Sequence, residues 1–296
     1  MRKGKYKMIK VIASDMDGTL LDKDHKISER TVKAIKAAVD AKIRFIIATG
    51  RSFEQAMHVL QGTGIECDYI VYSGAEIRNS KQEILQRSVM KIQDCRMVYE
   101  VLKEYELMYL FGVEDVDYCI GSTKNREQEL VHHILTFHPN MTEEEARESE
   151  LFRFFLSKTK VVNEFEELIE SGVDIIKIFA ASDDLNMLKE INDRLKVNSN
   201  LAIASSFENN IEITDVKAQK GISLKYYIES LGYSMEEVMV LGDSMNDYSM
   251  LSMDFGATVA MENGALEVKK AAKYITKSNE EDGVAYCIEE LLKKQG

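Results

Sequence analysis

Two short groups of acidic residues stand out because each directly follows a run of apolar residues. Asp15 and Asp17 come after Met8–Ser14, which predicts a buried strand, and Asp243 and Asp247 follow a second such run. Carboxylates this close together repel one another unless a cation lies between them. Carboxylate oxygens are also the ligands that Mg²⁺ prefers. The two groups together therefore predict a magnesium site.

Each acidic group taken alone also has a purely structural explanation. An Asp-Gly pair such as Asp17-Gly18 is common in surface turns, and Asp is favoured at the N-cap of a helix, which would explain Asp243 or Asp247. Two such groups at equivalent strand ends are far less easily explained by chance. The pairing is what favours a chemical role.

Several residues that would bind an anion also follow predicted strands. Thr49-Gly50-Arg51 ends one strand and opens a helix, where a hydroxyl and helix N-terminal amides attract negative charge. Ser73-Gly74 ends another strand and offers a further hydroxyl and amide, although an ordinary turn explains it equally well. Lys220 precedes a helix, a position at which a lysine is usually just exposed.

The elements that must position these residues alternate between strand and helix. This alternation predicts an α/β fold with a doubly wound, Rossmann-like parallel sheet, in which ligands bind beyond the carboxyl ends of the strands. The expected strands are 8–14, 43–49, 69–72, 238–241, 258–261 and 274–276, and the expected helices are 28–40, 52–60, 221–231, 247–253, 264–272 and 284–294.

The middle of the chain differs from its two ends and has enough apolar residues for a core of its own. We predict a core domain formed by 1–82 and 207–296, with an inserted α+β domain at 83–206. The expected strands of the insert are 107–113, 118–120, 151–156 and 175–180, and the expected helices are 93–105, 127–137, 142–149, 160–171 and 184–195.

Composition excludes some classes of function. The net charge of -12 argues against a broad nucleic-acid-binding face, which needs a surplus of Lys and Arg. No apolar run approaches the length of a membrane span, about 18 residues or more. The basic start, Met1–Lys7, precedes an apolar run too short for a signal peptide. The four scattered cysteines fit reduced thiols, so a cytoplasmic protein is expected.

These pieces, in this order, resemble the haloacid dehalogenase (HAD) superfamily of phosphohydrolases. The resemblance rests on Asp15-Met16-Asp17-Gly18-Thr19-Leu20, Thr49, Lys220 and Gly242-Asp243-Ser244-Met245-Asn246-Asp247, and it spans nearly the whole chain. The long insert resembles the type IIB cap of the Cof-type branch. The segment Asn279–Ala285 also matches that branch.

The resemblance implies a role for each of these residues. Asp15 would be the nucleophile that forms an aspartyl-phosphate, and Asp17 would be the general acid and base. Mg²⁺ would bind Asp15, the backbone carbonyl of Asp17 and Asp243, with Asp247 supporting that shell. The residues expected to bind the phosphoryl group are Thr49, Gly50, Lys220 and Asn246, and those expected to contact the substrate are Arg51, Ser73 and Gly74.

The expected activity is hydrolysis of a phosphomonoester in a small metabolite, such as a sugar phosphate or a phosphorylated cofactor. Two alternatives stay open. A phosphomutase or phosphotransferase would pass the phosphoryl group to a sugar hydroxyl, and Asp17 would serve that reaction equally well. A non-catalytic receiver would be phosphorylated on Asp15 to switch partners, but it would need neither a general base nor a large cap.

Overall fold

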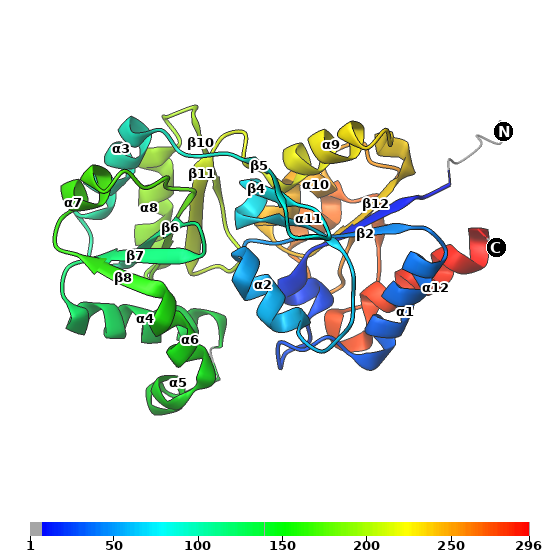
Figure 1. Ribbon diagram of the computed structural model, residues 1–296, viewed down its shortest axis with the longest axis horizontal. Helices are drawn as coiled ribbons and strands as arrows, with labels where there is room; N and C mark the ends of the chain where they lie inside the picture. The colour runs from blue at the N-terminus through cyan, green and yellow to red at the C-terminus, as the bar shows by residue number, and fades with distance from the viewer. Residues whose placement is uncertain (1–7, 139, 296) are drawn as a thin grey trace. The chain divides into compact units, whose positions relative to one another are not determined.

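The computed structural model describes residues 8–138 and 140–295, so the basic segment Met1–Lys7 lies outside the described residues. The chain divides into two compact units (Figure 1). Unit 1 comprises residues 1–87 and 217–296, and unit 2 comprises residues 88–216. The two ends of the chain therefore fold together, and unit 2 is inserted between them in sequence.

Unit 1 is built on an eight-stranded sheet in the order β14-β13-β12-β1-β2-β3-β4-β5. The strands from β14 to β3 run parallel, and the β4–β5 hairpin adds two antiparallel strands at one edge. Its strands are β1 (Val11–Ser14), β2 (Arg44–Ala48), β3 (Asp68–Val71), β4 (Glu76–Arg78), β5 (Ile84–Arg87), β12 (Val238–Gly242), β13 (Ala257–Ala260) and β14 (Tyr274–Ile275).

Helices cover both faces of this sheet: α9, α10 and α11 lie on one side, and α1 and α12 lie on the other (Figure 1). The helices of unit 1 are α1 (Glu29–Asp40), α2 (Phe53–Leu60), α9 (Lys220–Ser230), α10 (Tyr248–Leu251), α11 (Leu266–Ala271) and α12 (Gly283–Gln295). Because both faces are covered, the central strands are buried and apolar. The predicted α/β class with a doubly wound parallel core is confirmed.

The strand order brings the predicted site residues to one edge of the sheet. Strand β1 lies between β12 and β2, and Ser14 is in register with Leu241 on one side and with Ile47 on the other. The residues that follow these three strands therefore emerge side by side. This is the edge at which open α/β sheets bind their ligands.

Unit 2 contains a six-stranded sheet in the order β10-β11-β9-β6-β7-β8, antiparallel except for the pair β7–β8. Its strands are β6 (Met108–Val113), β7 (Val116–Ile120), β8 (Thr159–Val162), β9 (Lys177–Ala181), β10 (Leu201–Ala204) and β11 (Asn210–Asp215). Its helices are α3 (Ile92–Leu102), α4 (Thr123–Phe137), α5 (Glu143–Glu148), α6 (Glu150–Lys158), α7 (Phe165–Glu170) and α8 (Leu185–Leu195).

Two element predictions in unit 2 are wrong. The segment 151–156 was expected to be a strand, but it lies in helix α6, which Ser149 caps by accepting a hydrogen bond from the Phe152 amide. Phe152 and Phe155, three residues apart, pack together in one apolar cluster with α4. The segment 160–171 was expected to be wholly helical, but its first residues form β8, and helix α7 begins only at Phe165.

The domain boundaries also differ from those expected at 82/83 and 206/207. Strand β5 (Ile84–Arg87) pairs with β4 and so extends the sheet of unit 1, and strand β11 (Asn210–Asp215) pairs with β9 and β10 inside unit 2. The connections therefore fall at 87/88 and 216/217. Apolar content marks where a core is, but backbone pairing decides where each unit ends.

Within residues 8–138 and 140–295, every helix is too short or too polar to cross a lipid bilayer. All four cysteines carry unpaired thiols, and Cys67, Cys95 and Cys119 are buried.

Candidate active site

Asp15 lies directly after β1 and is held by a buried lysine. The Lys220 Nζ atom donates to Asp15 Oδ1 at 2.6 Å, to Asp247 Oδ1 at 2.6 Å and to Asn246 Oδ1 at 3.0 Å. Lys220 is 0% exposed and Asp15 is 3% exposed. Burial lowers the pKa of Lys220, but Asp15 and Asp247 outweigh burial and raise that pKa above its usual value. This lysine is therefore a permanent buried cation.

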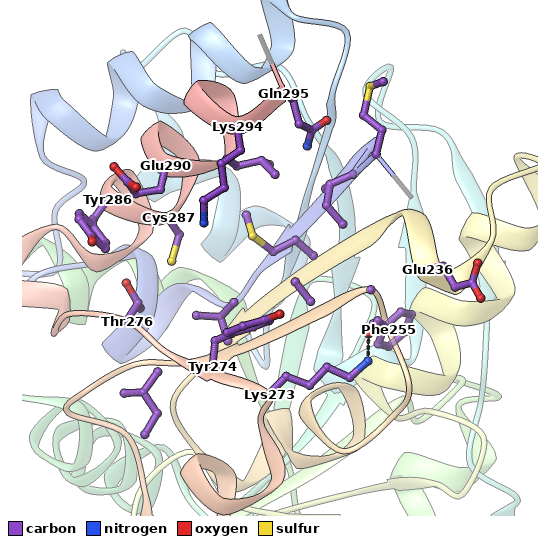
Figure 2. Close-up of a pocket in the computed structure, with 18 of the residues that line it drawn as sticks. Glu236, Phe255, Lys273, Tyr274, Thr276, Tyr286, Cys287, Glu290, Lys294 and Gln295 are labelled. Atoms are coloured by element: carbon purple, nitrogen blue, oxygen red, sulfur yellow. Dashed lines mark hydrogen bonds between the residues drawn. The ribbon is translucent and has the colours of Figure 1, made fainter. Parts of the chain in front are cut away.

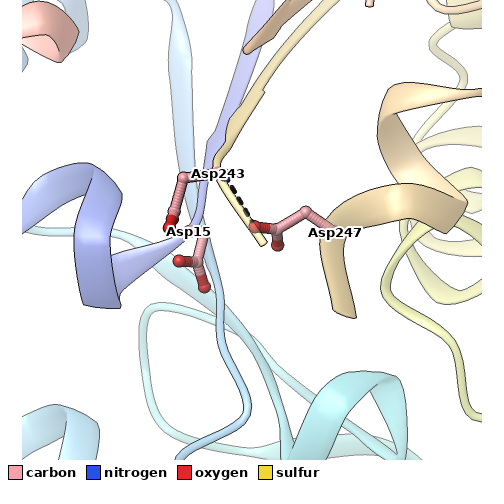
Figure 3. Close-up of side chains that lie close together, drawn as sticks. All are labelled: Asp15, Asp243 and Asp247. Atoms are coloured by element: carbon pink, nitrogen blue, oxygen red, sulfur yellow. Dashed lines mark hydrogen bonds between the residues drawn. The ribbon is translucent and has the colours of Figure 1, made fainter. Parts of the chain in front are cut away.

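Lys220 contacts two of three carboxylates that lie close together, and Figure 3 shows these three side chains. Oxygens of Asp15, Asp243 and Asp247 lie within 4.8 Å of one another. Asp247 Oδ2 accepts hydrogen bonds from the backbone amides of Asp243 (2.9 Å) and Ser244 (3.2 Å), which fixes its direction. Thr19 Oγ1 donates to Asp243 Oδ1 at 2.7 Å. The structure thus brings Asp15 of the first predicted acidic group together with Asp243 and Asp247 of the second.

The electrostatics of this cluster favour a bound cation. Burial and the Asp247 carboxylate raise the pKa of Asp15 well above its usual value, against the opposing effect of Lys220. Burial and Asp247 likewise raise the pKa of Asp243 to about 7. One lysine therefore does not offset the repulsion among three carboxylates. Hard oxygen donors at such short separations suit a divalent ion such as Mg²⁺.

Asp17 does not join this cluster through its carboxylate. Its Oδ2 and Oδ1 accept hydrogen bonds from Arg51 Nε at 2.8 Å and Nη2 at 2.6 Å, in a two-point ion pair. His25 Nδ1 lies 3.5 Å from Asp17 Oδ1. Burial raises the pKa of Asp17, but Arg51 and His25 outweigh it and hold that pKa well below its usual range. Sequence reasoning placed Arg51 beside the substrate and did not foresee this pair.

Thr49 directly follows β2 and is fully buried, and the helix after it begins within one residue of the predicted start at 52. Thr49 Oγ1 accepts a hydrogen bond from the Arg51 amide at 3.2 Å. Helix α2 begins at Phe53, and Ser52 and Gln55 form a capping box that uses the amides of both. The anion site expected at Thr49 and Gly50 therefore consists of the hydroxyl and loop amides more than of the helix terminus.

Ser73 and Gly74 form a buried turn after β3, with φ of +58° and +106°. A Cβ atom at Gly74 would lie 2.5–2.8 Å from backbone atoms of Gln219 and Lys220. The Ser223 hydroxyl also donates to the Gly74 carbonyl at 2.6 Å. Gly74 thus allows the turn to pack on the first residues of α9, and so it helps to place Lys220. The substrate contacts expected of Ser73 and Gly74 remain predictions.

The cavity drawn in Figure 2 is unrelated to this site. It has a volume of about 1260 Å³, lies in unit 1, and is lined by residues such as Ile9, Met239, Ala257, Tyr274 and Tyr286. Ile9, Met239 and Ala257 lie at or near the first residues of their strands, the edge of the sheet opposite Asp15. None of the predicted site residues lines it.

Comparison with known proteins gives the class of this chain. The family model described as haloacid dehalogenase-like hydrolase matches residues 12–288. The 5-amino-6-(5-phospho-D-ribitylamino)uracil phosphatase YwtE of Bacillus subtilis is 29% identical over 287 residues, with 97% of this chain and 99% of that protein covered. YcsE, a phosphatase of the same name and organism, is 29% identical over 280 residues, with 95% and 94% covered.

Among solved structures, a haloacid dehalogenase-like hydrolase from B. subtilis is similar with a TM-score of 0.83 and 26% identity. The match covers 95% of this chain and 99% of that one. Taken with these relatives, the fold and its buried acidic site define a hydrolase of the phosphatase class. The chain belongs to the family of haloacid dehalogenase-like hydrolases, as the sequence motifs predicted.

Proposed function

We propose that this enzyme hydrolyses the phosphomonoester of a small metabolite, with Mg²⁺ as its cofactor and Asp15 as its nucleophile. The observation that carries the proposal is the buried contact of Lys220 with Asp15 and Asp247, beside Asp243. An anionic nucleophile and an anionic phosphate repel one another. A buried ammonium group beside the nucleophile offsets that repulsion where the phosphate would bind.

The donor set fits a divalent cation. Asp15 and Asp243 would hold Mg²⁺ with their carboxylates, and Asp17 would hold it with its backbone carbonyl. The Asp247 carboxylate would keep Asp243 in place by accepting a hydrogen bond from the backbone amide of Asp243. When bound, the ion would neutralise negative charge on the carboxylates and on the phosphate oxygens. Lys220, Thr49, the Gly50 amide and Asn246 would bind the remaining phosphoryl oxygens.

The reaction would proceed in two displacements. An Asp15 oxygen forms a bond to phosphorus while the bond to the leaving oxygen breaks, and Asp17, which has taken up a proton from solvent, gives that oxygen its proton. A water molecule then attacks the aspartyl-phosphate while Asp17 takes the proton from it. The bond between Asp15 and phosphorus breaks, so phosphate is released, Asp15 is a carboxylate again, and Asp17 is protonated as it was when the first displacement began.

Asp17 must leave its ion pair with Arg51 before it serves as an acid. A carboxylate that accepts two hydrogen bonds from one guanidinium group is held in its ionised form. We therefore regard the Arg51-bound position as the resting position of Asp17. Substrate that draws Arg51 or Asp17 away would release this carboxylate for proton transfer.

The substrate class is proposed from the relatives. YwtE and YcsE are named for a phosphorylated ribitylamino compound, which is a small metabolite with a phosphate on a polyol chain. We infer a phosphorylated sugar or polyol as the substrate here. Unit 2 would act as the cap domain and would select the substrate, since the proposed phosphate-binding residues of unit 1 would contact only the phosphoryl group that all such substrates share.

The test is release of inorganic phosphate from a panel of phosphorylated sugars, polyols and cofactors, with Mg²⁺ present. Wild-type enzyme should release phosphate, and Asp15→Asn should lower kcat by about 10⁴-fold or more, as removal of a directly reacting group does elsewhere. Equal rates for the two proteins would contradict the proposal. A phosphorylated sugar product without free phosphate would indicate a phosphotransferase instead.

A further inference from the structure

Two asparagines from the last part of the chain hold the loop that carries Asp15 and Asp17. Asn263 Nδ2 donates to the Gly18 carbonyl at 2.8 Å, and Asn279 Nδ2 donates to the Leu21 carbonyl at 2.8 Å. The Asn279 amide in turn donates to Asn263 Oδ1 at 3.0 Å. These three hydrogen bonds link the two asparagines to each other, to the middle of the Met16–Leu20 turn and to Leu21 directly after it, and we call the pair the Asn263–Asn279 clasp.

The residues that follow Asn279 form further hydrogen bonds with the chain between the Asp15 turn and helix α1. Glu280 Oε1 accepts a hydrogen bond from the Lys23 amide at 2.6 Å, and Asp282 Oδ1 accepts one from the Ser28 hydroxyl at 2.5 Å. The short helical turn Asn279–Glu281 therefore contacts the chain from Leu21 onward as far as the start of α1. All of these contacts lie within unit 1.

The turn that the clasp holds has an unusual backbone. Inside Met16–Leu20, Asp17 has an extended conformation and Gly18 has φ of +76°, so the turn is not a regular helix. The peptide whose carbonyl Asn263 contacts joins Gly18 to Thr19, and the Thr19 hydroxyl contacts Asp243. The clasp is thus one residue from Asp17 and one residue from a direct contact with the acidic cluster.

We propose that Asn263 and Asn279 are positioning residues for the reaction at Asp15. This inference rests on the proposed function, because it assigns a task within that chemistry. The clasp acts only on backbone carbonyls, so it sets the direction of the Asp17–Thr19 backbone without touching a reacting group. Displacement of a reacting group by about 1 Å costs roughly 100-fold in rate.

A purely structural role would have a different signature. Asn263 is exposed, and an ordinary hydrogen bond contributes only about 0.5–1.5 kcal/mol to stability. Its loss would lower the melting temperature slightly and leave the rate per folded enzyme intact. A positioning role would lower kcat by about 10- to 100-fold, the range seen when groups that support a catalytic shell are removed.

The experiment compares Asn263→Ala, Asn263→Asp and a control, Asn79→Ala, for kcat, KM and thermal unfolding. Asn263→Asp keeps the oxygen that accepts from the Asn279 amide but places a second oxygen opposite the Gly18 carbonyl. Asn79 also bridges a surface loop of unit 1, contacting Glu83 and Lys81, but it lies away from the Asp15 turn.

Both Asn263 variants should lose kcat by about tenfold or more, with KM changed by less than about threefold, while Asn79→Ala keeps the wild-type kcat. Wild-type kcat in folded Asn263 variants would overturn the clasp, and so would an equal loss in Asn79→Ala. A wild-type enzyme that releases no phosphate would instead contradict the proposed function itself, so the two failures are distinguishable.

Discussion

At the scale of single residues, the site is defined by an excess of buried negative charge. Asp15, Asp243 and Asp247 share one small volume with a single buried lysine. Burial and the neighbouring Asp247 carboxylate raise the pKa of both Asp15 and Asp243, although Lys220 acts in the opposite direction on each. The carboxylates of the metal-free protein therefore repel one another, and a bound divalent cation would relieve this repulsion.

This repulsion gives a pH-dependent prediction. The pKa of Asp243 is raised from 3.8 to about 7, so in the metal-free protein stability is lost as pH rises through that interval and these carboxylates ionise. The proposed Mg²⁺ would compete with protons for the same oxygens. The gain in melting temperature on adding Mg²⁺ should therefore be small near about pH 5 and larger near about pH 7.5.

Thermal unfolding with and without Mg²⁺ at the two pH values checks this prediction. Asp243→Asn removes one of the proposed ligand charges and should shrink the gain at the higher pH. A gain that is the same at both pH values in the wild-type protein would contradict a cation bound by these carboxylates.

Residue types and spacing were enough to predict that Asp15 and Asp243 lie close together, but Lys220 and Asn246 were expected at the site only from the family resemblance. Lys220 looked like an ordinary exposed lysine beside a helix, yet it is buried against Asp15. The ion pair of Asp17 with Arg51 depends on the direction of two side chains, which spacing does not encode. Thr19 and Asn279 lie within the motifs that resemble the family. Their hydrogen-bond partners, Asp243 for Thr19 and Leu21 for Asn279, are distant in sequence and so could not be predicted from those motifs.

At the scale of elements, the turn after β1 depends on Gly18. This residue has φ of +76°, and a Cβ atom there would overlap the Asp243 carboxylate. Gly62 has a similar φ of +81° but nothing lies within 4 Å of the position of its Cβ. The two glycines thus share a backbone conformation that L-residues disfavour by about 1–2 kcal/mol, and only one of them faces the site.

We predict that Gly18→Ala and Gly62→Ala will lose similar stability for that backbone reason, whereas only Gly18→Ala will also lose activity and Mg²⁺ affinity. Displacement of Asp243 should lower kcat by about tenfold or more, on the scale of other disturbed metal shells. Steady-state kinetics with Mg²⁺ titration measures both effects. An active Gly18→Ala enzyme with unchanged Mg²⁺ affinity would show that the close approach to Asp243 is unimportant.

The sequence predicted two kinds of element well: strands that are buried on both faces, and helices that begin at a recognisable capping residue. The central strands β1, β2 and β12 are continuous apolar runs, and Ser28 marks the start of α1 by accepting from the Thr31 amide. The prediction of a strand at 151–156 was wrong because five of its six residues are apolar, and such a run has neither the period of a helix nor that of a strand. Its helix is decided by tertiary contacts with α4, which local pattern does not contain.

At the scale of the whole molecule, each of the two units has one or more apolar clusters of its own. One apolar cluster lies within unit 1 and includes Leu251, and another lies within unit 2 and includes Leu168; both side chains are 0% exposed. Since each unit buries its own apolar residues, each should respond to damage in its own core. Composition alone misplaced the unit boundaries because it does not show that β5 pairs with a strand of unit 1 or that β11 pairs with strands of unit 2.

We predict that Leu168→Ala will speed amide hydrogen exchange mainly within residues 88–216, and that Leu251→Ala will do so mainly within unit 1. Each change removes a fully buried leucine and should cost about 2–5 kcal/mol in the unit that contains it. Hydrogen exchange followed by mass spectrometry resolves the two regions. Equal acceleration across both units in both variants would mean that the chain unfolds as one cooperative body.

The central claim is that Asp15 itself takes the phosphoryl group from the substrate. Its most direct test is to quench the enzyme in acid during turnover of a phosphorylated sugar with Mg²⁺ and to map phosphorylation by peptide mass spectrometry. We predict phosphate on Asp15 in the wild-type enzyme and none at this position in Asp15→Asn. Turnover without phosphate on Asp15, or phosphate carried by another residue, would contradict the claim.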